Sequence, residues 1–300
     1  MNFRRLRGFV LLPTLLLAAC GRMHKAPFEK LPLAPGQIQV AKVSERANLS
    51  VERVRFWSGE MNEPRFFIAL IPKTKTPPAE VFILNHGWAD RPEDLLRHLK
   101  VDQVYDEMLG HGEVRPAIVI LPDVRFKSFY RQNAKSFPYP NYLTLVAEEV
   151  AGVVSRQYNI PFDRQRWAIG GFSFGGHVSL DIGRRYPGRF SSVSVVSGFG
   201  DEEWSYWPAQ AAAAGALDSR GRGKQTVVVA GPAPRLFLAC GSDDRLFATM
   251  SYMHSKLSEL GIPHEWSTGP GGHTWKYWSS VLPAMLKFHL ASKQHQVEAK

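Results

Sequence analysis

The chain has 300 residues, of which 44% are hydrophobic and 21% are charged, and its formal net charge is +10. This composition lies in the range of ordinary globular proteins, so one larger α/β domain is the default expectation. The basic excess is spread thinly, and its densest cluster, Arg220, Arg222 and Lys224, has no interleaved aromatic residues. We therefore exclude a nucleic-acid partner at this stage.

The first nineteen residues have the pattern of a secretion signal. Three arginines precede a largely apolar run over 9–19, which is too short for the roughly 20 residues of a membrane-spanning helix. The motif Leu-Ala-Ala-Cys-Gly at 17–21 resembles a bacterial lipobox, so Cys20 is predicted to be lipidated. We expect a lipoprotein held by this anchor on a membrane of the bacterial cell envelope, facing the periplasm or the cell surface.

Residues 20–45 contain several prolines and little periodicity, which predicts a tether between the lipid and the folded part. The segments 49–56 and 66–71 are rich in β-branched and aromatic residues, which indicates an antiparallel strand pair at one edge of a sheet. A single folded domain is expected over 46–295.

Beyond that pair, short apolar runs alternate with longer segments of helical spacing. The predicted strands are 81–84, 117–121, 167–169, 193–196, 236–239 and 264–267, and the predicted helices are 92–109, 142–158, 175–186, 247–260 and 275–290. This alternation is typical of an α/β fold with a mainly parallel central sheet flanked by helices. Segment 199–234 breaks the rhythm and is interpreted as a lid insertion near the mouth of the site.

The motif Gly171-Phe172-Ser173-Phe174-Gly175 lies between a predicted strand and a predicted helix. In that context G-x-S-x-G is typical of the sharp turn that carries the nucleophilic serine of α/β-hydrolases. We expect side chains at 171 and 175 to collide with neighbouring elements, and Ser173 to adopt a strained backbone conformation. Ser173 is the predicted nucleophile.

A serine hydroxyl needs a base and a third group that orients the base, and in this fold the acid and the histidine follow the serine in that order. Three later histidines are serious candidates for the base: His254, His264 and His273. His273 is preferred because it follows a glycine-rich loop after the last strand, whereas the other two fall in a predicted helix and a predicted strand. His177, one helical turn beyond Ser173, is assigned a structural role.

The acid is expected in the turn after strand 236–239, where Asp243 and Asp244 compete for one position. Asp244 is preferred, Asp243 is the alternative, and Asp201 after the preceding strand is a third candidate. The aspartate that is not the acid is expected to cap the following helix.

Acyl transfer also needs backbone N–H donors that stabilise the oxyanion. The N–H of Phe174, which follows the nucleophile, is one predicted donor. Trp88, after His86-Gly87 and the strand at 81–84, is the other, and its indole is expected to line the pocket.

Several short motifs together resemble one family of esterases. They are Leu84-Asn85-His86-Gly87, Ile120-Leu121-Pro122-Asp123, Gly171 to Gly176, Tyr186-Pro187-Gly188-Arg189-Phe190, Gly241 to Asp244 and Gly272-His273-Thr274-Trp275. The chain from 49 to 290 is similar to the family of esterase D, S-formylglutathione hydrolases, feruloyl and acetyl xylan esterases, enterochelin esterases and the antigen 85 mycolyltransferases. The resemblance implies an α/β-hydrolase fold and supports Asp244 as the acid and His273 as the base. Trp88-Ala89 departs from the glycines common at that point.

The sequence thus predicts a serine carboxylic ester hydrolase that works through an acyl-enzyme, with a small-molecule or glycan-linked ester as substrate and no metal or organic cofactor. Trp204, Trp207 and Trp275 are candidates for binding the substrate. Two alternatives stay open: an acyltransferase to a sugar or lipid hydroxyl with the same triad, and a non-catalytic envelope lipoprotein that binds a glycan or a protein. The acyl and alcohol groups and the oligomeric state are not predicted.

Overall fold

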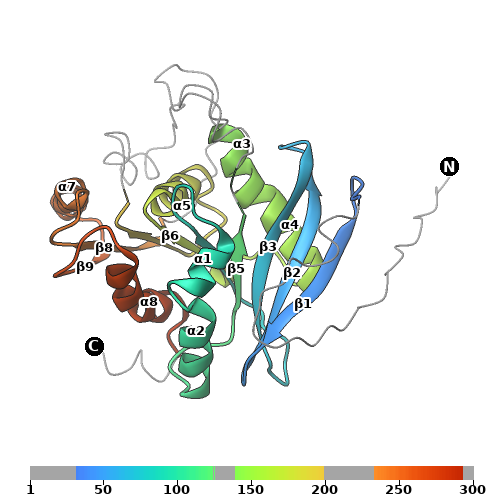
Figure 1. Ribbon diagram of the computed structural model, residues 1–300. Helices are drawn as coiled ribbons and strands as arrows, with labels where there is room; N and C mark the ends of the chain where they lie inside the picture. The colour runs from blue at the N-terminus through green and yellow to red at the C-terminus, as the bar shows by residue number, and fades with distance from the viewer. Residues whose placement is uncertain (1–31, 124, 126–138, 199–232, 293–300) are drawn as a thin grey trace.

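The protein is described here by a computed structural model that covers residues 32–123, 125, 139–198 and 233–292. These residues form one nine-stranded sheet in the order β1-β2-β3-β5-β4-β6-β7-β8-β9 (Figure 1). The strands are β1 (Ile38–Glu45), β2 (Leu49–Ser58), β3 (Glu63–Pro72), β4 (Val81–Asn85), β5 (Ile118–Pro122), β6 (Trp167–Phe172), β7 (Ser192–Val196), β8 (Arg235–Gly241) and β9 (His264–Gly269).

Strands β1, β2, β3 and β5 pair antiparallel, and all pairs from β5 through β4 to β9 are parallel. The predicted fold class, a mainly parallel sheet with an antiparallel N-terminal edge, is confirmed. β4, β5, β6 and β7 are buried at every residue, which is why their sequences read as continuous apolar runs rather than as alternating ones.

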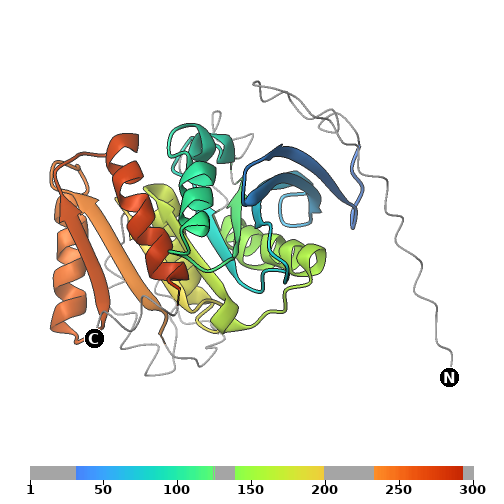
Figure 2. The ribbon, with the colours of Figure 1, turned by 90° about the horizontal axis from the view of Figure 1, so that it is seen from below.

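Helices cover both faces of the sheet (Figures 1 and 2). They are α1 (Pro92–Arg97), α2 (Val101–Gly110), α3 (Tyr139–Thr144), the π-helix η4 (Leu145–Val150), α4 (Ala151–Tyr158), the short 3₁₀-helix η5 (Arg164–Arg166), α5 (Phe174–Arg185), α7 (Phe247–Glu259) and α8 (Trp275–Leu290). One buried cluster joins η4, α4, α5 and α7 to the sheet, and a second joins α1, α2 and α8 to the other face. Among the described residues, no helix is both long and apolar enough to cross a bilayer.

Residues 38–45 were expected in the tether, and that expectation is wrong because they form the edge strand β1 against β2. The partly buried side chains of Ile38 and Val40 pack against the core, whereas every residue of the strand stays at least partly exposed. A half-exposed edge strand carries a weak alternation, and the prolines that precede it obscured the pattern.

One predicted helix is divided in the structure, and another is continuous but changes its helix type. The segment 92–109 breaks into α1 and α2 at Lys100, whose φ of 51° is left-handed. The segment 142–158 contains the π-helical turn η4 between α3 and α4. Neither the break at Lys100 nor the π-helical turn carries a proline or glycine signal, so helical spacing alone did not show them.

The proposed signal peptide, residues 20–31 of the tether with Cys20, and the proposed lid up to residue 232 lie outside the described residues. The described loops after β4, β6, β8 and β9 all leave the carboxyl ends of parallel strands. Because those ends share one edge of the sheet, residues far apart in the sequence meet there.

Candidate active site

Ser173 occupies a sharp turn between β6 and α5. Its φ of 54° and ψ of −123° are costly for a residue with a side chain. A Cβ on Gly175 would lie 2.4 Å from the carbonyl oxygens of Asn85 and His86, and a Cβ on Gly171 would lie 2.5 Å from the backbone of Gly175. Only glycine fits at 171 and 175, as expected, and the packed strands and helix hold the strained serine in place.

His273 joins Ser173 to Asp244 in one hydrogen-bonded chain. Its Nε2 lies 2.9 Å from Ser173 Oγ, and its Nδ1 lies 3.0 Å from both carboxylate oxygens of Asp244. The Asp244 side chain is fully buried, while that of His273 keeps 17% of its surface exposed. The structure therefore brings the predicted nucleophile, base and acid together in the required order.

The two neighbouring aspartates have different environments. Asp244 accepts a hydrogen bond from the backbone N–H of Leu246 in addition to its contact with His273. Asp243 is exposed, and its carboxylate accepts the N–H of Gly271 at 3.3 Å. The aspartate that is not the acid was expected to cap the next helix. That expectation is wrong, because α7 has no side-chain cap and the Asp243 carboxylate instead accepts a hydrogen bond from the loop that carries His273.

Backbone hydrogen bonds fix the acid loop to the base loop. Ser242 N–H donates to the carbonyl of Gly269 at 2.8 Å, and Asp243 N–H donates to that of Gly271 at 2.9 Å. A Cβ on Gly241 would lie only 2.0 Å from the Gly271 oxygen, so the loops touch through backbone alone. Because the two loops are joined by backbone atoms, the distance between Asp244 and His273 is fixed by the backbone.

Trp278 on α8 packs against the ring of His273. The two rings meet edge to face at a centroid distance of 5.0 Å, and only 5% of the surface of Trp278 is exposed. Trp275, a predicted substrate-binding residue, is partly buried and packs against Trp278 and stacks on His98. Trp275 therefore packs on the side of Trp278, which in turn packs against the His273 ring.

The predicted oxyanion donors lie on the other side of the serine. Phe174 is the first residue of α5, so its N–H belongs to the helix terminus, where no carbonyl of the helix can accept it. A Cβ on Gly87 would lie 3.5 Å from Ser173 Cβ, which places the loop before Trp88 directly beside the nucleophile. The rings of Trp88 and Phe174 meet edge to face at 4.9 Å.

Buried polar groups hold the loop after β4. Burial lowers the pKa of His86, so its ring is neutral, and its Nδ1 donates to the Gly87 carbonyl at 2.8 Å. Asp90 packs against the other side of Gly87, and burial together with the charge of Asp94 raises its pKa to about 6, although the Gly87 N–H donates to its carboxylate. The sequence interpretation missed Asp90, and its short separation from His86-Gly87 was the one available signal.

A narrow hollow borders these donors. It is lined by His86, Gly87, Trp88, Ala89, Arg125, Tyr142 and Phe174, and its accessible volume is about 10 Å³. That volume holds about one water molecule. Tyr142 and Arg125 were not predicted here, because nothing local in the sequence shows that the start of the 142–158 helix faces the hollow.

The remaining predicted residues do not join the site or cannot be placed. His254 and His264 hydrogen-bond to each other at 2.7 Å, and His177 contacts Phe174. Trp204 and Trp207, Asp201 and Cys20 lie outside the described residues. In the described ranges no three histidine, cysteine or acidic side chains are grouped to hold a metal ion.

Comparisons with known proteins find related esterases. The model of the Esterase family, described as "Putative esterase", matches residues 58–289. An acetyl esterase from Caldicellulosiruptor saccharolyticus is 22% identical over 264 residues, which are 78% of this chain and 96% of that protein. An esterase from Mycobacterium tuberculosis is 24% identical over 194 residues, 54% of this chain and 42% of that protein.

Solved structures show the same fold. A ferulic acid esterase superposes with a TM-score of 0.65 at 22% identity, covering 81% of this chain and 98% of that one. An S-formylglutathione hydrolase from Agrobacterium tumefaciens gives 0.61 at 18% identity, covering 82% and 96%. Since the family model covers more than half of the chain, the chain belongs to the Esterase family and is a carboxylic ester hydrolase with an α/β-hydrolase fold.

Proposed function

We propose that the protein hydrolyses carboxylic esters through an acyl intermediate on Ser173. The observation that carries this proposal is the chain of hydrogen bonds from Ser173 Oγ through His273 to the buried Asp244. A serine hydroxyl alone is a weak nucleophile at neutral pH, and an imidazole at 2.9 Å is in position to remove its proton. The same geometry favours catalysis over the alternative of a non-catalytic binding lipoprotein.

The three triad residues have different roles. As Ser173 Oγ attacks the ester carbonyl, its proton passes to His273 Nε2, and His273 then donates that proton to the departing alkoxide. Asp244 accepts the Nδ1–H, fixes the tautomer and stabilises the imidazolium. A water molecule, deprotonated by His273, then attacks the acyl-serine, and the carboxylic acid leaves as Ser173 regains its proton.

The backbone N–H groups of Phe174 and Trp88 are the proposed oxyanion donors. Their support is the position of Phe174 at the amino end of α5 and of the Gly87–Trp88 loop against Ser173. Donors of this kind typically contribute about 3 kcal/mol each to stabilising the transition state.

We further propose that the acyl group is small, with acetyl esters as the preferred class. The support is the narrow hollow beside the donors, together with the likeness to a protein named acetyl esterase. Solved relatives are named ferulic acid esterases, one of them in complex with ferulic acid, so feruloyl esters are the competing class.

The test is hydrolysis of 4-nitrophenyl acetate, 4-nitrophenyl butyrate and methyl ferulate by the wild type, Ser173→Ala and Ser242→Ala. Ser242 is an exposed serine on the acid loop, so its replacement is the matched control. We expect acetate to be turned over fastest, with activity lost in Ser173→Ala and kept in Ser242→Ala. Activity that survives in Ser173→Ala would overturn the mechanism, and preference for ferulate would overturn only the acyl class.

Added alcohols distinguish hydrolysis from acyl transfer. With a radiolabelled acetyl donor and glycerol or glucose present, we expect the label to appear as acetate. Label found mainly in an ester of the alcohol would make the protein an acyltransferase with the same triad.

We also propose that Cys20 carries a lipid that anchors the protein in the bacterial envelope. The support is the lipobox-like motif after a short apolar run. Expression of the full chain in a bacterium should give detergent-phase protein with an acylated Cys20 in the mass spectrum, and Cys20→Ala should abolish both. A wild-type protein that keeps residues 1–19 or lacks the acyl mass would contradict the anchor.

A further inference from the structure

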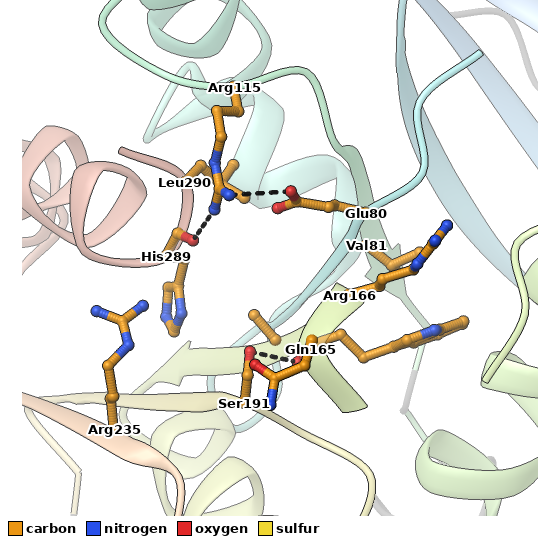
Figure 3. A pocket seen from close by; sticks show the side chains of 11 residues that line it. Glu80, Val81, Arg115, Gln165, Arg166, Ser191, Arg235, His289 and Leu290 are labelled. Atoms are coloured by element: carbon orange, nitrogen blue, oxygen red, sulfur yellow. Dashed lines mark hydrogen bonds and ion pairs between the residues drawn. The ribbon is translucent and has the colours of Figure 1, made fainter. Parts of the chain in front are cut away.

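A polar pocket lies at the amino ends of the parallel strands, whereas Ser173 lies at their carboxyl ends. It has a volume of about 260 Å³ and is formed by the amino ends of β4, β6 and β8 and by the end of α8 (Figure 3). Because β6 is six residues long, the pocket and the nucleophile are roughly 20 Å apart. Its polar side chains above the floor are Glu80, Arg115, Gln165, Arg166, Ser191 and Arg235.

The lining is cationic. It contains three arginines and one glutamate, so its net charge is +2 when the fifth titratable residue, His289, is neutral. Burial, helped by the nearby charge of Arg235, holds the pKa of His289 well below its usual value, and the ring is therefore uncharged. Ser192 Oγ and Ser194 Oγ lie 2.8 and 2.9 Å from its two ring nitrogens and fix it as a rigid floor.

Two of the arginines face the floor from opposite sides (Figure 3). Arg115 Nη1 lies 3.0 Å from Glu80 Oε1, while its buried Nε has no hydrogen-bond partner. Arg235 donates from Nη2 to the carbonyl of Phe288 at 2.9 Å, and within the described ranges it has no carboxylate at ion-pair distance. Partial burial lowers the pKa of Arg235, Glu265 raises it and Arg115 lowers it, so the two guanidinium groups repel each other.

The third arginine, Arg166, is paired with an aspartate outside the pocket. Arg166 lies at the rim, and its Nε is 3.3 Å from Asp163 Oδ2, with both side chains more than 40% exposed. Ser191 Oγ donates to the carbonyl of Trp167 at 3.1 Å. Arg115 also donates from Nη2 to the carbonyl of His289 at 3.4 Å, and the Arg235 guanidinium lies 4.6 Å above the Phe288 ring. The groups left to meet a ligand are therefore the remaining N–H groups at the edges of the two guanidiniums, together with the amide of Gln165.

We propose that this pocket binds a phosphate group between Arg115 and Arg235. Guanidinium groups recognise phosphate through paired hydrogen bonds, and a dianion matches the net charge of the lining. A bound phosphate reduces the repulsion between the two arginines and supplies the negatively charged partner that Arg235 lacks among the described residues. The shared chemistry is a phosphoryl dianion, either the free ion or a phosphate monoester. The site does not involve Ser173 and is independent of the esterase reaction.

The test is calorimetric titration with inorganic phosphate and with glycerol 3-phosphate at constant ionic strength. The proteins are the wild type, Arg115→Gln, Arg235→Gln, Arg235→Lys and Arg156→Gln. Arg156 is an exposed arginine on α4 that does not line the pocket, so its variant controls for loss of one positive charge. Arg235→Lys keeps the positive charge but loses the paired donors of the guanidinium. It therefore tests the proposal even if Arg115→Gln does not fold.

We expect saturable binding of at least one ligand to the wild type, with affinity reduced about tenfold or more in Arg115→Gln and Arg235→Gln and less than twofold in Arg156→Gln. Arg235→Lys should lie between the wild type and Arg235→Gln. The better of the two ligands identifies the source of the phosphate. No saturable binding at millimolar ligand, or equal affinities in all five proteins, would overturn the proposal, and Ser173→Ala should bind as the wild type does.

Discussion

The geometry of Ser173 depends on glycine at position 175. Its missing side chain lets two carbonyl oxygens of the β4 loop approach the start of α5. Those carbonyls belong to Asn85 and His86, which lead into the loop that carries Trp88, a proposed oxyanion donor. The strained serine, the loop and the helix are therefore held by one close backbone contact.

Gly175→Ala is predicted to destabilise the protein by at least about 2 kcal/mol and to abolish esterase activity, because its Cβ would lie 2.4 Å from backbone oxygens that cannot move freely. Chemical denaturation and an esterase assay measure both effects. Gly269→Ala is the control, since a Cβ there meets nothing within 4 Å. Equal stability of the two variants would show that the elbow is less tight than described.

Asp244→Asn is predicted to lower kcat by about 10³- to 10⁴-fold, because the amide removes the charge that stabilises the imidazolium of His273. Asp243→Asn should lower kcat by less than about tenfold, since Asp243 holds only the Gly271 backbone. Steady-state kinetics on the two variants separates the roles. A larger loss in Asp243→Asn would reverse the assignment of the acid.

Asp90 gives the stability a pH dependence. Burial and Asp94 raise its pKa from 3.8 to about 6, so the folded protein binds this proton more tightly than the unfolded chain does. The free energy of unfolding is therefore predicted to lose a contribution as pH rises from about 4 to about 6. Asp90→Asn should not show this loss.

The measurement is urea denaturation of the wild type, Asp90→Asn and Glu107→Gln at pH 4.5 and pH 7. Glu107 is an exposed carboxylate on α2 and serves as the control. The stability of Asp90→Asn relative to the wild type should be greater at pH 7 than at pH 4.5, and that of Glu107→Gln should not change. A relative stability of Asp90→Asn that is independent of pH would count against the raised pKa.

At the scale of elements, strand β1 moves the start of the folded domain from 46 to 38. It covers the edge of β2, which otherwise presents unpaired N–H and carbonyl groups to other chains. The π-helical turn η4 and the break at Lys100 are two further local departures from the regular α-helices that the sequence predicted.

A variant that lacks residues 1–45 is predicted to unfold at a temperature about 5 °C or more below that of a variant that lacks residues 1–37, and to aggregate more readily. The reason is the loss of the pairing between β1 and β2 and of the apolar contacts of Ile38 and Val40. Calorimetry and light scattering compare the two. Equal unfolding temperatures would place the domain boundary after β1.

For the whole molecule, the sequence was most informative where local pattern and chemistry coincide. The serine turn is recognisable because glycine is required at 171 and 175, and buried parallel strands show as apolar runs. His273 was identified from its place after a glycine loop. The choice between Asp243 and Asp244 needed coordinates, because both lie in one turn and only the fold shows which carboxylate faces the imidazole.

Features that depend on distant elements were not predictable. The hollow near Ser173 is built from the β4 loop, Arg125, Tyr142 and Phe174, and the proposed phosphate pocket joins six segments at the amino ends of the parallel strands. No local spacing connects Arg115 with Arg235, which are 120 positions apart in the chain. The sheet brings them together, as it does the catalytic residues.

The most direct test of the account is the mass of the protein after reaction with a fluorophosphonate. The proposed mechanism predicts one adduct, located on Ser173 by peptide mapping, with loss of esterase activity in parallel and with no adduct in Ser173→Ala. An intact protein that hydrolyses esters yet takes up no label, or that carries the label on another residue, would contradict Ser173 as the nucleophile.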